Sequence, residues 1–192
     1  ENERLHERIA SLELEVVRLR AAGVENERLR ESLGLPGYRP PSLRPAEVLA
    51  LAGEPVPAAA TLSAGAAQGV RTGDGVVTSD GLVGRVSEVY PGLSRMALLT
   101  DPNAAVACEV ESTGVQGIVR FDPSPRPRLL LTGVPLADTV RRGQLVLTSG
   151  MSLRYPRGLP VGRVIRLGRD ASGLTQEIEL EPAARLSRLR HA

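Results

Sequence analysis

The chain has 192 residues and a formal net charge of +2, with 42% hydrophobic but only 2% aromatic residues. That length allows a long helix and one or two small domains whose cores are built from aliphatic side chains. A charge so close to balance, with so few rings to stack on bases, argues against nucleic acid as a partner.

The first 33 residues carry the heptad pattern of a coiled coil. The apolar positions that recur at alternating spacings of four and three are Leu5, Ile9, Leu12, Val16 and Leu19. β-Branched residues at a with leucine at d favour a parallel two-stranded coil. In such a pair Arg8 would face Glu13 of the second helix, and Glu15 would face Arg20. The pattern therefore predicts a homodimer, with two separate helices or one helix packed on its own domain as the alternatives.

The coiled-coil register falters at Gly23, which takes the next a position. A glycine inside a helix costs roughly 1 kcal/mol relative to alanine, so we expect a weakened or kinked spot there. The helix is predicted to end near Gly34. Four prolines between residues 34 and 45 then indicate a stiff, extended linker.

A β-region follows, built around a unit that occurs twice. The first copy spans residues 70–86 and the second spans residues 140–164, so that Thr78 matches Thr148. The second copy carries an insertion between its halves. Turn glycines followed by runs of Val, Leu and Thr predict turn, strand, turn, strand in each copy. The duplication indicates two similar β-modules.

Short strands separated by Gly and Pro turns fill the rest of the chain, about a dozen in all. We detect no helical pattern between them, which favours small barrels or a sandwich over an α/β fold. The single cysteine, Cys108, lies on the apolar side of a predicted strand over residues 104–111 and is interpreted as a small buried hydrophobe.

The search for a catalytic site is negative. The two histidines, His6 and His191, lie in the helix and at the C-terminal end, away from any serine of the β-modules. Cysteine and histidine are too few for a zinc site, and aspartates beside turn residues are interpreted as turn formers. Glu177 and Glu179 are interpreted as a solvated stripe rather than a carboxylate pair. We therefore predict no enzymatic activity, no metal and no cofactor.

The most specific stretch runs from Thr148 to Val164 and contains Tyr-Pro-Arg-Gly-Leu-Pro-Val-Gly-Arg-Val, while residues 81–86 read Gly-Leu-Val-Gly-Arg-Val. Together with the coiled coil before them, these runs resemble the MreC family, the rod-shape-determining proteins of the bacterial cell-wall elongation machinery. The residues that match its signature turns are Gly81, Gly84, Tyr155, Pro156, Gly158 and Gly162. We interpret the glycines as fold-determining first and as partner contacts second.

The resemblance implies a mainly β fold with an N-terminal α-helix: a dimeric coiled coil followed by two small six-stranded β-barrels. The domains expected from it are 1–33 as the coiled-coil helix, 34–45 as the linker, 46–112 as the first barrel, 113–185 as the second barrel and 186–192 as the tail. C-terminal strands are candidates to complete the first barrel. No stretch reaches the ~20 apolar residues of a spanning helix, and we expect a single-pass anchor before Glu1, with this part on the periplasmic side of the inner membrane.

The resemblance also implies a non-enzymatic scaffold of the elongation complex. Its partners would be MreD, MreB, and the class B penicillin-binding transpeptidase with its glycosyltransferase, besides homodimers and higher self-assembly. Two alternatives stay open. A periplasmic adaptor of an export system would normally carry a helical hairpin, whereas this chain has one helical arm. A degenerate protease-like β-barrel protein would need a usable histidine to be active.

Overall fold

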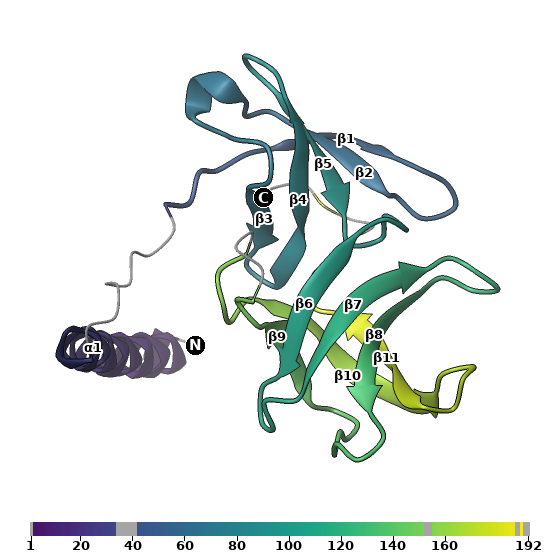
Figure 1. Ribbon diagram of the computed structural model, residues 1–192. Helices are drawn as coiled ribbons and strands as arrows, with labels where there is room; N and C mark the ends of the chain where they lie inside the picture. The colour runs from purple at the N-terminus through teal and green to yellow at the C-terminus, as the bar shows by residue number, and fades with distance from the viewer. Residues whose placement is uncertain (1, 34–41, 152–154, 187–188, 190–192) are drawn as a thin grey trace. The chain divides into compact units, whose positions relative to one another are not determined.

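The computed structural model describes residues 2–33, 42–151, 155–186 and 189. The chain divides into two units, Glu1–Ser42 and Leu43–Ala192. The first unit holds the helix α1 and the second holds all the described strands (Figure 1). The expectation of a mainly β fold with an N-terminal helix is confirmed.

Helix α1 runs from Asn2 to Ser32. Leucine, arginine, glutamate and alanine dominate it, and these are among the strongest helix formers. The helix continues through Gly23, where a weakened spot was expected, so the cost of one glycine is outweighed by its neighbours. None of its described residues is buried. The predicted helix end at Gly34 and the linker residues 34–41 lie outside the described residues.

The first β-module is an antiparallel sheet of five strands in the order β1-β2-β5-β4-β3. The strands are β1 Val48–Ala52, β2 Ala59–Leu62, β3 Gly75–Thr78, β4 Gly81–Val89 and β5 Ser94–Leu98. A short 3-10 helix, Ala66–Gln68, lies between β2 and β3.

The second β-module is a closed barrel of six strands in the order β10-β11-β8-β7-β6-β9, which confirms one of the two expected six-stranded barrels. The strands are β6 Ala105–Val110, β7 Gln116–Asp122, β8 Arg128–Pro135, β9 Leu145–Thr148, β10 Pro160–Arg169 and β11 Thr175–Pro182. Closure removes free strand edges.

Two details of the expected domains need correction. The boundary at residues 112/113 falls too late, because β6 pairs with β7 and β9 and therefore belongs to the second module. The first module has five described strands rather than six. The segment after β11 contributes the buried side chains of Ala184 and Leu186 without forming a described strand. Pro182, which ends β11, has no backbone N–H with which to continue a ladder.

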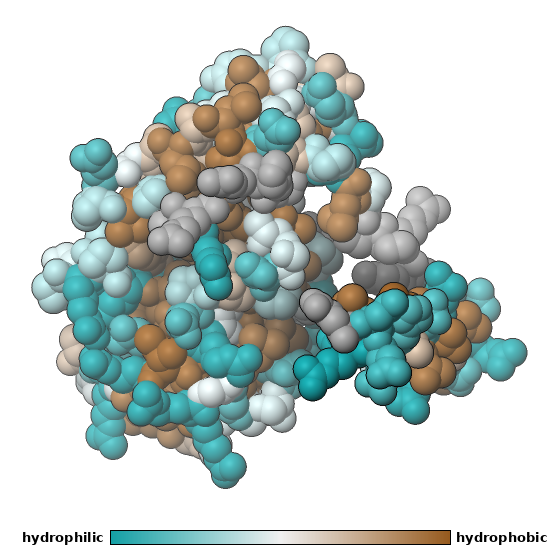
Figure 2. Space-filling model, turned by 180° about the vertical axis from the view of Figure 1, so that it is seen from behind, coloured by the Kyte–Doolittle hydropathy of each residue, from teal (hydrophilic) through white to brown (hydrophobic). Residues whose placement is uncertain are grey.

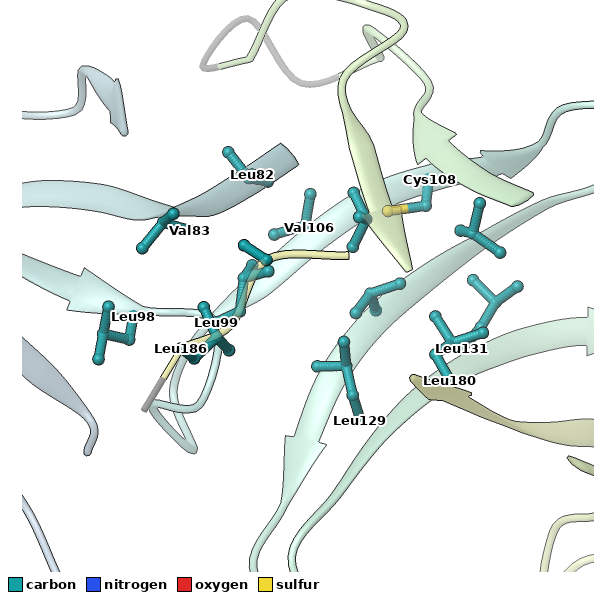
Figure 3. Packing of buried hydrophobic residues seen from close by; sticks show 14 of the residues in the cluster. Leu82, Val83, Leu98, Leu99, Val106, Cys108, Leu129, Leu131, Leu180 and Leu186 are labelled. Carbon is teal, nitrogen blue, oxygen red and sulfur yellow. The ribbon is translucent and has the colours of Figure 1, made fainter. Parts of the chain in front are cut away.

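One buried cluster of aliphatic side chains runs through both modules. It includes Leu82 and Leu98 from the sheet and Leu131 from the barrel, all fully inaccessible to solvent. Figure 3 shows Leu186, from the segment after β11, drawn among Leu98 and Leu99. The aliphatic core predicted from composition is therefore present, and the end of the chain is packed into it.

Candidate interaction surfaces

The predicted dimer residues form one exposed apolar stripe on α1, which we call the inner seam. Its members are Leu5, Ile9, Leu12, Val16 and Leu19, and even the least exposed of them, Leu12 and Val16, are 44% exposed. A shallow groove follows part of the seam, with Glu13 and Arg20 among its lining residues. Apolar surface stands beside charged surface on the helix in Figure 2. A helix in a protein draws most of its stability from packing an apolar face, and none of the described residues of α1 is buried.

The two copies of the repeated unit have the same backbone hydrogen bonds. In the first copy the N–H of Gly73 donates to the carbonyl of Val86 at 2.9 Å. In the second the N–H of Gly143 donates to the carbonyl of Val164 at 2.8 Å. Each copy pairs its short strand with the following long strand, β3 with β4 and β9 with β10. The predicted turn, strand, turn, strand order is confirmed in both copies.

Two of the signature glycines allow a close approach between neighbouring strands. A Cβ atom at Gly84 would lie 2.1 Å from the carbonyl oxygen of Ala97 on β5. A Cβ atom at Gly162 would lie 2.6 Å from the carbonyl oxygen of Glu181 on β11. The two glycines occupy matching places in the repeat, so the same steric demand explains both.

Thr78 and Thr148, which match each other in the repeat, stabilise the turn that follows each short strand. The hydroxyl of Thr148 donates to the carbonyl of Pro156 at 2.6 Å and accepts the N–H of Leu159 at 2.9 Å. The hydroxyl of Thr78 makes the weaker equivalent, donating to the carbonyl of Gly81 at 3.4 Å. Both threonines therefore make local hydrogen bonds to the backbone of the turn.

Gly81 lies where the two modules meet. Its φ of +149° is unfavourable for a side chain, and a Cβ there would lie 2.3 Å from the carbonyl oxygen of Pro160, with Ala183 also close. Strands β4 and β10, which match each other in the repeat, are thus in contact at this point. The duplicated unit therefore forms part of each module and also part of the contact between the two modules.

The C-terminal end of the insertion in the second copy is anchored to the barrel. Tyr155 is buried in the cluster, and Gly158 has a φ of +92°. Arg157 places its guanidinium 2.8 Å from the carboxylate of Glu109, a buried acid on β6. Sequence reasoning missed this pair, because the partners are 48 residues apart and Glu109 belongs to no motif.

Glu177 and Glu179 of β11 are paired with arginines, which corrects their interpretation as a solvated stripe. Glu177 lies 3.3 Å from Arg128, and Glu179 lies 3.2 Å from Arg126. Arg128 also donates to Asp122 at 2.6 Å and holds the pKa of that carboxyl below its ordinary value. These ion pairs stabilise the contact between neighbouring segments of the barrel. Their role is therefore structural.

Cys108 lies inside the barrel, fully inaccessible to solvent, as expected for a small buried hydrophobe (Figure 3). Burial raises the pKa of its thiol to about 12, since a thiolate would be desolvated there. A thiol in this state is a poor nucleophile.

Within the described residues, no three His, Cys, Asp or Glu side chains come together as a metal site would require. His6 lies on α1, and His191 is outside the described part of the chain. A search of the same residues for helices long and apolar enough to cross a membrane found none.

The edge strand β1 offers a second apolar surface. It reads Val-Leu-Ala-Leu-Ala, and Leu49 and Leu51 are 57% and 38% exposed. An uncharged edge strand can pair with an added strand through its free backbone groups.

A family model described as "Rod shape-determining protein MreC, barrel core" matches residues 48–192. A cell shape-determining protein MreC from Caulobacter vibrioides is 34% identical over 167 residues, covering 86% of this chain and 47% of that relative. The chain thus spans about half the length of this curated relative.

Solved structures show the same fold. MreC from Listeria monocytogenes matches 99% of this chain and 90% of its own, with a TM-score of 0.83 and 29% identity. A chain of the complex between penicillin-binding protein PBP2 and MreC from Helicobacter pylori matches 77% of this chain and 93% of its own. Its TM-score is 0.61 and its identity 18%, so this likeness concerns the fold alone.

Proposed function

The chain belongs to the MreC family of rod shape-determining proteins, and on that premise we propose that it is a dimeric, non-enzymatic scaffold for cell-wall synthesis. The family is named for cell shape and not for a reaction, in agreement with the expectation that the chain is no enzyme. The observation that supports the scaffold role is that one chain combines a helix with an exposed apolar seam and a β-region that has its own buried core.

The dimer is supported by the inner seam of α1. Its residues are exposed within the chain, and their spacing matches the a and d positions of a parallel two-stranded coil. Glu13 and Arg20 flank the seam and would face Arg8 and Glu15 of a parallel partner helix. Exposed pairs of this kind contribute little energy but bias the orientation.

Val16→Asp is expected to convert the dimer to a monomer, because it places a carboxylate at a buried a position. Sedimentation velocity of the full chain over a concentration series measures the change. Ser11→Asp, on a side of the helix away from the seam, should leave the dimer intact. A wild-type chain that stays monomeric at every concentration would refute the dimer.

We further propose that the β-region binds a class B penicillin-binding transpeptidase. Support comes from the Helicobacter pylori relative, which forms a complex with PBP2. The exposed apolar edge of β1 is the surface we assign to this contact, since an extended segment can add to it as a further strand. The glycosyltransferase partner, MreD and MreB are proposed from the family likeness alone. So are a periplasmic location and a membrane anchor outside this chain.

Leu49→Lys with Leu51→Lys is expected to weaken binding of the chain to the immobilised extracytoplasmic part of the transpeptidase from the same bacterium. Charged lysines on an edge strand disfavour strand addition. Leu174→Lys, at an apolar position that is 75% exposed just before β11, is the control and should bind normally. Surface plasmon resonance measures both. Equal binding by both variants would show that β1 is not part of the contact. Absence of binding by the wild type would refute the transpeptidase as a partner.

A further inference from the structure

The chain after β11 links the two modules. We call residues 183–186 the C-terminal strap. Its start is tied to the barrel, because the N–H of Ala183 donates to the carbonyl of Val161 on β10 at 3.0 Å. Its end, Leu186, is 6% exposed and belongs to the buried cluster, where Figure 3 draws it near Leu98 of the first module. The strap therefore reaches from the barrel into the core of the sheet.

The other connections between the modules allow a change of angle. The strands of the sheet pair with one another and the strands of the barrel do the same, so no described ladder crosses from one module to the other. The chain passes from β5 to β6 through residues 99–104, which we call the connector, and Pro102 and Asn103 at its tip are exposed. Besides the connector, β4 contacts β10 at Gly81 and Pro160. A few loop residues between two packed bodies are the usual site of a hinge.

Few side chains hold the C-terminal strap in place. Strand β11 ends at Pro182, so the strap adds no described strand and its docking depends on its side chains. Ala184 is 3% exposed and Leu186 is 6% exposed, whereas Arg185 between them is exposed. Leu186 buries the larger apolar surface of the two. A segment with few buried apolar contacts and no ladder opens locally at a lower free energy than the strands around it.

We propose that the C-terminal strap is a reversible latch between the two modules. When the strap is docked, Leu186 fixes the angle between the sheet and the barrel. When the strap is released, the modules turn about the connector while the strands of each module stay paired. The edge of β1 and the surface of the barrel then present a fixed geometry to partners only while the strap is docked. The latch is independent of the proposed dimer and of the proposed transpeptidase contact, since both modules belong to one chain.

Spin labels on the two modules of the full chain measure this angle. Arg95→Cys on β5 and Arg120→Cys on β7 place the labels at exposed strand positions, and Cys108→Ala removes the native thiol. Mixing with an excess of unlabelled chain restricts the measurement to distances within one chain. Double electron–electron resonance then gives the distribution of distances between the labels. Leu186→Asp should broaden that distribution roughly twofold, because a carboxylate among aliphatic side chains undocks the strap.

Arg185→Asp is the matched control, because it introduces the same carboxylate at an exposed position of the strap. It should leave the distribution of distances unchanged. Equal widths for Leu186→Asp and the parent chain would overturn the latch, and so would equal broadening by Arg185→Asp.

Hydrogen exchange shows whether strands β1 to β5 stay protected in each variant. Leu186→Ala is the milder change and decides the case in which Leu186→Asp unfolds the sheet. A broader distribution with protected strands in Leu186→Ala supports the latch. An unchanged width, or loss of protection in Leu186→Ala, would overturn the latch, the second because the strap would then be part of the core of the sheet.

Discussion

Gly84→Ala should lower the free energy of unfolding of the β-region by about 3–5 kcal/mol, at the upper end of single substitutions. The added Cβ would lie 2.1 Å from the carbonyl oxygen of Ala97 and 2.9 Å from Cα of Leu98. Both are backbone atoms of β5, the strand that pairs with β4. The clash cannot be relieved by turning a side chain, so the two strands must separate locally.

Urea denaturation followed by circular dichroism measures this loss, and the melting temperature should fall by roughly 10 °C. Gly92→Ala is the matched control, because a Cβ there meets nothing within 4 Å and its φ lies outside the left-handed range. That variant should unfold within about 0.5 kcal/mol of the wild type. Equal midpoints for Gly84→Ala and Gly92→Ala would show that β5 moves aside at little cost.

The strands of the duplicated unit were predictable because turn residues separate them in the sequence. Turn glycines and β-branched runs identify strands β3, β4, β9 and β10 from local sequence, and the structure gives matching hydrogen bonds in both copies. The heptad pattern predicted α1 for a similar reason, since its spacing is a property of one helix. These elements are determined by residues that lie close together in the sequence, so a local sequence pattern is enough to predict them.

The parts that were missed depend on contacts between distant residues. The boundary between the modules was placed after β6, because nothing local tells which sheet a strand joins. The pair of Glu109 with Arg157 and the arginine partners of Glu177 and Glu179 were missed for the same reason. The steric need for glycine at Gly84 likewise arises from the backbone of β5.

The ion pairs of the β-region join its strands and turns, while its exposed large apolar residues include Leu49 and Leu51 on an edge strand. The helix shows the opposite organisation, with none of its described residues buried. A β-region with its own buried core beside a helix with an exposed apolar seam agrees with the proposed scaffold role. It also means that the two units respond to different substitutions.

The stability of the barrel should fall above pH 9 because of Cys108. Burial raises the pKa of this thiol from 9.0 to about 12. Below pH 9 the thiol is protonated in both the folded and the unfolded chain, and its contribution is constant. Between pH 9 and about 12 the unfolded chain releases the proton while the folded chain keeps it, so the free energy of unfolding drops by about 1.4 kcal/mol per pH unit.

Cys108→Ala isolates this effect, because every other titrating group is shared with the wild type. At pH 8 the variant should be less stable by about 1 kcal/mol, the cost of a small cavity. By about pH 10.5 the wild type has lost about 2 kcal/mol through Cys108, and the order of stability should reverse. Urea denaturation at a series of pH values measures both proteins. A difference in stability that stays constant from pH 8 to 10.5 would mean that the thiol ionises as easily in the barrel as in the unfolded chain. Reversal would instead show that the barrel interior excludes the thiolate, as its closed ring of six strands and aliphatic lining require.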